Sequence, residues 1–222
     1  MCLRRGIIFD MTICPVQPFD IPAIMKIERA AFIPQIQDKQ KVFEARLRAF
    51  PQGFFALLDN SPAAVMKNGY SVVAGYFCGE MRACVPQSDD FVCRTTGRQV
   101  LKSHVPGGGA LYVSSFALHS EYKERKLAKP FLEGSLESLC VSFKNIKVVF
   151  LLVSDEWKAA LRVCESLGFS SARVVRGAFP SLRKVGTDGM LMSCPADVFR
   201  NRSMSEIEPF FPRGDARLDE AR

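Results

Sequence analysis

The order of apolar and polar positions along the chain predicts alternating strands and helices. Short apolar or β-branched runs are typical of strands, and longer runs with apolar residues every three or four positions are typical of helices. The predicted strands are 12–15, 53–59, 70–83, 110–119, 146–153, 170–179 and 186–194. The predicted helices are 20–32, 39–50, 128–143 and 154–168. The chain therefore reads β-α-α-β-β, a long polar segment, then β-α-β-α-β-β.

Capping and turn residues support these limits. Asp20 is a predicted N-cap with Pro22 in the first turn of the first helix. Ser154 is the predicted cap of the last helix, and Gly168 its stop. Residues 60–69 read as a polar turn between two strands, and residues 84–109 as a long irregular loop.

Composition and charge narrow the class of protein. The chain has 222 residues, 48% of them hydrophobic and 24% charged, which is typical of one soluble globular domain. The net charge of +7 favours an anionic partner. Nucleic acid is an unlikely partner because aromatic and basic residues are not interleaved.

The sequence has no clear signal for a membrane segment, for disulfide bonds or for a metal site. We expect no membrane segment, because no stretch approaches the roughly 18 apolar residues that a transmembrane helix needs. The eight cysteines are scattered, without a C-x-x-C pair, so we expect reduced thiols and a cytoplasmic protein. The spacing of Cys78, Cys84, Cys93 and His104 matches no usual zinc pattern, and no metal is expected.

The stretch "HSEYKERKLAKPFLEG", residues 119–134, places four cations near the start of a predicted helix. Cations there are unfavourable unless an anion is bound, because the helix N-terminus is itself partly positive. Two interpretations are open. The stretch is either a solvated run of charges or a site for a phosphate-bearing ligand.

Three segments together resemble the GNAT superfamily of acyl-CoA-dependent N-acetyltransferases, over residues 11–194. They are "TICPVQPFDIPAIMKIERAAF", "YVSSFALHSEYKERKLAKPFL" and "LLVSDEWKAALRVCESLGF". Within the superfamily they are most similar to the arylalkylamine branch. The resemblance implies an α/β (α+β) fold, with a mixed central sheet of about seven strands and helices on both faces. Residues 1–10 would be an N-terminal extension and residues 195–222 a C-terminal tail.

The resemblance also implies acetyl-CoA as co-substrate. The family pattern of Arg or Gln, two residues, Gly, one residue, then Gly or Ala falls on residues 123–128, where Lys126 replaces the central glycine. The strand before it would pair its backbone with the pantetheine arm. The implied cofactor-binding residues are Phe116, Ala117, Leu118, Lys123, Glu124, Arg125, Lys126, Leu127, Ala128 and Lys129.

Three residues are catalytic candidates: Glu28, Tyr112 and Cys164. By resemblance, Tyr112 and Ser114 occupy the positions of two proton-removing histidines, and Cys164 that of an acidic tyrosine. Tyr112 is alternatively a packed residue of the cleft wall, and Cys164 a small core residue. Glu28 lies in an apolar helical stripe, where burial should raise its pKa and suit it to act as a general base; it is alternatively paired with a nearby cation or backbone group.

The function implied is acetyl transfer from acetyl-CoA to a primary amine of a small molecule or peptide, without an acyl-enzyme. We expect acceptor specificity to come from the first two helices and the loop before Leu111. The alternative is a GNAT-fold protein with weakened catalysis that binds a ligand or partner. Three departures from the family pattern, Lys126, Trp157 and Cys164, favour that alternative. The oligomeric state is left open.

Overall fold

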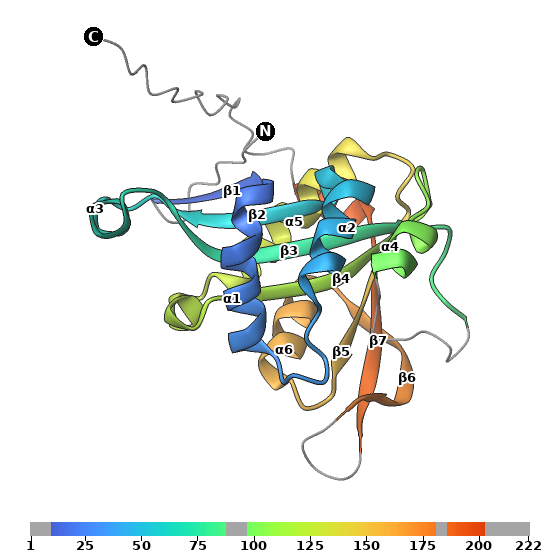
Figure 1. Cartoon of the computed structure of the whole chain (residues 1–222). Coiled ribbons are helices and arrows are strands. Elements are labelled where there is room, and N and C mark those ends of the chain that lie inside the picture. The colour runs from blue at the N-terminus through green and yellow to red at the C-terminus, as the bar shows by residue number, and fades with distance from the viewer. Residues whose placement is uncertain (1–9, 88–96, 181–185, 203–222) are drawn as a thin grey trace.

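The computed structural model describes residues 10–87, 97–180 and 186–202 (Figure 1). These residues form one seven-stranded mixed sheet in the order β1-β2-β3-β4-β5-β7-β6. The strands are β1 Met11–Pro15, β2 Phe54–Asp59, β3 Val72–Arg82, β4 Ala110–Leu118, β5 Val148–Ser154, β6 Ser170–Phe179 and β7 Thr187–Pro195. Only β4 and β5 are parallel neighbours. The predicted sheet of about seven strands is confirmed.

Helices cover both faces of this sheet, as expected. Helices α1 (Ile21–Ala31) and α2 (Gln40–Ala49) lie in front of it in Figure 1, and α5 (Ala128–Ser142) lies behind. The apolar stripe of α1 packs on β3 and β4, with Ile24 and Ile27 fully buried. On the other face Leu136 of α5 and Cys164 of α6 (Lys158–Ser166) enter a second core.

The structure corrects several predicted boundaries. Helix α3 (Pro62–Asn68) replaces the predicted turn, because Ser61 caps it through the Ala64 N–H. Helix α4 (Gly97–Ser103) lies in the predicted irregular loop, because Val100 packs on α2. The short 3-10 helices η1 (Pro18–Asp20) and η2 (Pro51–Gly53) were not predicted.

Two further corrections concern helix ends. The predicted cap Ser154 is the last residue of β5, and α6 begins four residues later, after a turn in which the Ser154 Oγ accepts the Glu156 N–H at 3.3 Å. Helix α7 (Asp197–Arg202) continues the fold into the predicted tail, because Phe199 is fully buried in the core. Residues 1–9 of the predicted extension and 203–222 of the predicted tail lie outside the described residues.

The strand that positions the candidate site is β4. It pairs with β5 only between Ala110–Val113 and Val148–Leu151, although both strands continue beyond these residues. On its other side β4 pairs with β3, and Ser114 forms a bulge there, because Cys78 pairs with Ser115 and Gly79 with Val113. The edge of β4 from the bulge to Leu118 thus faces a gap between β4 and β5.

Candidate active site

The loop between β4 and α5 takes a conformation that the sequence did not predict. A 3-10 helix, η3 (Ser120–Arg125), ends at Lys126, whose backbone is left-handed with φ 54° and ψ 28°. Among the described residues Lys126 is the only non-glycine residue with positive φ. This conformation costs a residue with a side chain about 1–2 kcal/mol. Glycine, which the resembling family pattern has at this position, adopts such a conformation without this cost.

A buried carboxylate at the end of β2 anchors this loop. Asp59 accepts hydrogen bonds from the Tyr122 hydroxyl at 2.8 Å and the Ser61 N–H at 2.9 Å, and Arg125 Nη1 lies 3.5 Å from it. Burial acts to raise the pKa of Asp59, but these hydrogen bonds and Arg125 outweigh it and lower the pKa. The Arg125 guanidinium also lies over the Tyr122 ring, 4.6 Å from its centre. The positive charge of Arg125 therefore lies beside the end of β2.

The remaining predicted cofactor residues lie between β4 and α5 and in the first turn of α5, which begins at Ala128. Lys123, Glu124, Lys126 and Lys129 have exposed side chains, whereas Leu127 is buried at the N-cap of α5. The N–H groups of the first turn of α5 have no partners within the helix, and this end carries a partial positive charge. Exposed cations beside such a helix start suit a phosphate group.

The predicted strand segment 116–118 leads directly into this loop. The Phe116 ring packs on Phe131 of α5, with ring centres 5.3 Å apart, and Leu118 is buried. Ala117 faces the α1 side of the sheet. These side chains pack in the core. The groups that face the gap between β4 and β5 are therefore the backbone N–H and C=O groups of the strand.

Glu28 is almost completely buried, with 1% of its side chain exposed. One carboxylate oxygen accepts the backbone N–H of Asp38 at 2.7 Å, and the other accepts the hydroxyl of Tyr76. The Tyr76 hydroxyl lies 3.0 Å from Ser115 Oγ on β4. Burial raises the pKa of Glu28, and the hydrogen bonds from Tyr76 and Asp38 only partly offset this. Tyr76 and Ser115 were not found from the sequence.

The other two catalytic candidates lie in packed surroundings. Tyr112 is 7% exposed and stacks on Phe150 in the paired part of β4, with ring centres 5.0 Å apart. Cys164 lies in the core with Leu167 and Phe169, and burial raises the pKa of its thiol to about 12. Neither side chain lines the pocket described next. Both side chains are therefore packed against apolar neighbours, and their catalytic roles stay predictions.

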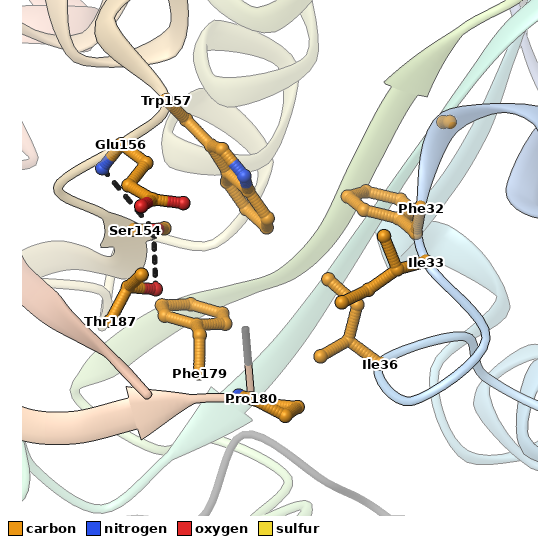
Figure 2. A pocket seen from close by; sticks show the side chains of 10 residues that line it. Phe32, Ile33, Ile36, Ser154, Glu156, Trp157, Phe179, Pro180 and Thr187 are labelled. Carbon is orange, nitrogen blue, oxygen red and sulfur yellow. Dashed lines mark hydrogen bonds between the residues drawn. The ribbon is translucent and has the colours of Figure 1, made fainter. Parts of the chain in front are cut away.

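A pocket of about 260 Å³ opens between the end of α1, the turn before α6 and the end of β6 (Figure 2). The Trp157 ring stands in its wall, 5.6 Å from the ring centre of Phe32 and 5.0 Å from that of Phe179. The rest of the lining is Ala31, Ile33, Ile36, Ser154, Glu156, Pro180 and Thr187. The Phe32 N–H bonds the Glu28 carbonyl at 3.1 Å, so the pocket lies one helical turn from Glu28.

A buried ionic network fixes the connection between α1 and α2. Arg46 bonds Asp38 at 2.7 Å and Glu80 at 3.2 Å, and Glu80 also bonds Arg82 at 2.6 Å. Burial acts to lower the pKa of Arg46, but the facing carboxylates outweigh it, and Arg46 stays charged. Because the Asp38 N–H also bonds Glu28, this network holds the segment that lines the pocket.

Within residues 10–87, 97–180 and 186–202, no group of three or more His, Cys, Asp and Glu side chains could hold a metal ion. In the same residues no helix is long and apolar enough to cross a membrane.

The structure matches solved GNAT proteins, although no family model and no curated protein sequence matches the chain. The ribosomal-protein-S18-alanine N-acetyltransferase of Escherichia coli is 21% identical, with a TM-score of 0.57, over 90% of this chain and 99% of that one. The loading GNATL domain of CurA from Lyngbya majuscula is 16% identical, with a TM-score of 0.67, over 84% and 98%. NAA60 of Arabidopsis thaliana in complex with acetyl-CoA is 18% identical, with a TM-score of 0.61, over 84% and 99%. The chain therefore has the GNAT fold.

Proposed function

We propose that this protein is an acyl-CoA-dependent N-acetyltransferase that moves the acetyl group of acetyl-CoA to a primary amine. The observation that carries the proposal is the edge of β4 from the bulge at Ser114 to Leu118, which is unpaired on its β5 side. The left-handed turn at Lys126 and the start of α5 follow it along the chain. A strand edge, a turn and a helix N-terminus in this order offer hydrogen bonds to an extended chain that ends in phosphates.

The cofactor would lie along this edge. Its pyrophosphate would bind the N–H groups at the start of α5, with Lys123, Lys126 and Lys129 supplying charge. Its pantetheine arm would pair with the backbone of residues 116–118, as the sequence resemblance implied. The acetyl group would then lie near the bulge, where backbone N–H groups can polarise its carbonyl. NAA60 supports this choice of cofactor, since its solved structure contains acetyl-CoA.

The acceptor would enter through the pocket between α1, α6 and β6. Its aromatic and branched lining favours an amine that carries an apolar or aromatic group, as in an arylalkylamine or the first residue of a peptide. Glu156 lines the same pocket and can attract the ammonium group. The amine nitrogen would attack the thioester carbonyl directly: the C–N bond forms, the C–S bond breaks and the CoA thiolate leaves. We propose Glu28 as the final acceptor of the amine proton.

The second candidate function is binding of an acyl-CoA without efficient turnover. The position where the family has its acid is occupied by Cys164, which is buried and has a thiol pKa of about 12. Such a thiol is a poor proton donor at neutral pH. Release of the CoA thiolate would then depend on water.

Binding and turnover separate the two candidates. Acetyl-CoA at about 100 times its Kd should stabilise the native protein by about 2.7 kcal/mol, which raises the Tm by about 5–10 °C. Turnover is followed as free CoA thiol, with arylalkylamines, polyamines and peptides as acceptors. The acyltransferase proposal requires both signals, whereas binding without turnover favours the second candidate. No Tm shift at saturating acetyl-CoA would refute both.

A matched pair of charge reversals tests where the cofactor binds. Lys123→Glu should weaken acetyl-CoA binding about tenfold or more, because it places a negative charge beside the phosphates. Lys67→Glu is the control, since Lys67 is an exposed lysine in the last turn of α3. Equal loss in both variants would mean that only the overall charge matters.

A further inference from the structure

A series of side-chain hydrogen bonds connects β4 to α1, and the proposed cofactor contacts do not use these side chains. Its outer member, Ser115, is partly exposed and follows the bulge directly. Its middle member, Tyr76, is fully buried on β3, and its inner member is the carboxylate of Glu28. Each of these three groups can pass or accept a proton. Tyr76 is 48 residues from Glu28 and 39 residues from Ser115 in the sequence, and the fold brings all three together.

Glu28 cannot reach a bound amine by itself. Its side chain is 1% exposed, and its two oxygens are engaged by the Asp38 N–H and the Tyr76 hydroxyl. A base that is buried in this way can act only through a neighbour that is closer to the substrate. Ser115 is that neighbour, because β4 beyond Val113 is unpaired on its β5 side.

We propose that Ser115, Tyr76 and Glu28 form a proton relay from the open edge of β4 to the buried carboxylate on α1. This inference rests on the proposed function. Ser115 would be the catalytic residue that contacts the amine, and Tyr76 and Glu28 would act through it. The Asp38 N–H holds one Glu28 oxygen at 2.7 Å, which leaves the other directed at Tyr76.

The proton transfers balance along this chain. The acceptor's ammonium group first loses one proton to water, which frees the nitrogen lone pair. As this lone pair forms the C–N bond, the nitrogen passes a second proton to the Ser115 oxygen. Ser115 passes its own proton to the Tyr76 oxygen, and Tyr76 passes its proton to the Glu28 carboxylate. Both hydroxyl groups are restored and Glu28 becomes a carboxylic acid. The departing CoA thiolate takes a proton from water, and after product release the Glu28 proton returns to water by the same path.

The charged and titratable groups that face Glu28 fit this direction of transfer. They are Asp38 on the connection to α2, Arg46 on α2, and Tyr76 and Cys78 on β3. Burial raises the pKa of Tyr76 and Cys78 well above their usual values, so both keep their protons at neutral pH. Tyr76 can therefore donate to the Glu28 carboxylate, whose pKa burial raises above its ordinary value.

The test compares Ser115→Ala, Tyr76→Phe and Glu28→Gln with the full-length protein and one acceptor that it acetylates. Each variant should lose about 100-fold in kcat, the usual contribution of a general base, with the KM for acetyl-CoA within about twofold. Glu28 accepts a proton only as a carboxylate, so wild-type activity should fall as the pH falls through its raised pKa, and Glu28→Gln should lack this decline. The double variant Tyr76→Phe with Ser115→Ala should be no slower than either alone, because both break one path.

A control variant and the possible outcomes complete the test. Ser135→Ala removes a buried hydroxyl that bonds only within α5, at the Phe131 carbonyl, and should leave kcat unchanged. The relay is overturned if Ser115→Ala keeps kcat within about threefold, or if the losses multiply in the double variant. Should Tyr76→Phe fail to fold, Ser115→Ala decides alone, because Ser115 is partly exposed. A wild-type protein that acetylates no amine overturns the proposed function and the relay together, whereas active variants overturn the relay alone.

Discussion

Replacing Lys126 with glycine should have opposite effects on two quantities. Its backbone conformation predicts a gain in the stability of the free protein, and its charge predicts a loss of acetyl-CoA binding. The residue holds a left-handed conformation, φ 54° and ψ 28°, that glycine adopts without strain. Its exposed ammonium lies in the loop proposed to bind pyrophosphate. Lys126→Gly should therefore stabilise the free protein and weaken acetyl-CoA binding.

The expected size of each effect follows from the geometry. Relief of the left-handed conformation is worth about 1–2 kcal/mol, and the extra freedom of glycine in the unfolded chain costs about 0.5–1 kcal/mol. The net gain, about 0.75 kcal/mol at the middle of these ranges, should raise the Tm by about 1.5–3 °C. Loss of one ammonium near a solvated phosphate should weaken acetyl-CoA binding by about fivefold.

Two measurements and one matched variant separate these effects. Thermal unfolding without ligand reports the backbone, and calorimetric titration with acetyl-CoA at low and high salt reports the charge. Lys126→Ala loses the ammonium but keeps a Cβ, so it should bind like Lys126→Gly and gain no stability. Equal Tm values for the two variants would refute the backbone argument. Tighter binding by Lys126→Gly than by wild type would show that the lysine side chain obstructs the phosphates.

The remaining predictions concern the loop anchor, the core thiol and the pocket. Tyr122→Phe should cost about 1–3 kcal/mol, because Asp59 loses a buried donor. Since the pKa of Asp59 is lowered, the contribution of this anchor is present above the ordinary value of 3.8 and is lost as the pH falls, so the Tm gap to wild type should shrink in acid. Cys164→Ala should keep kcat within about twofold, because a thiol of pKa about 12 contributes little acid catalysis, and a loss of 100-fold would contradict this. Phe32→Ala should raise the KM for an aromatic amine about tenfold, with the 71% exposed Phe19, changed to Ala, as the unaffected control.

Local patterns predicted most of the fold. The strands and the main helices follow from periodicity within short windows, and Gly168, with φ 97°, ends α6 as expected. The errors lie where tertiary contacts override local signals. Ser154 carries the signature of a helix cap, but pairing with Gly189 keeps it in β5. Phe199 lies in the predicted tail, directly before its charged stretch, yet it is fully buried in the core.

For the candidate site too, local sequence determined some features and tertiary contacts determined the others. By itself, the sequence determined the cluster of cations before α5 and a carboxylate within the apolar stripe of α1, because both depend on neighbouring residues. Only the tertiary structure decided what these groups can do. It brought Tyr122 to Asp59 across 63 residues, brought Tyr76 to Glu28 across 48, and ended the pairing of β4 with β5 at Val113. Such contacts depend on strand order and register, which are set by the packing of the whole chain. The apolar periodicity of a single segment therefore does not predict them.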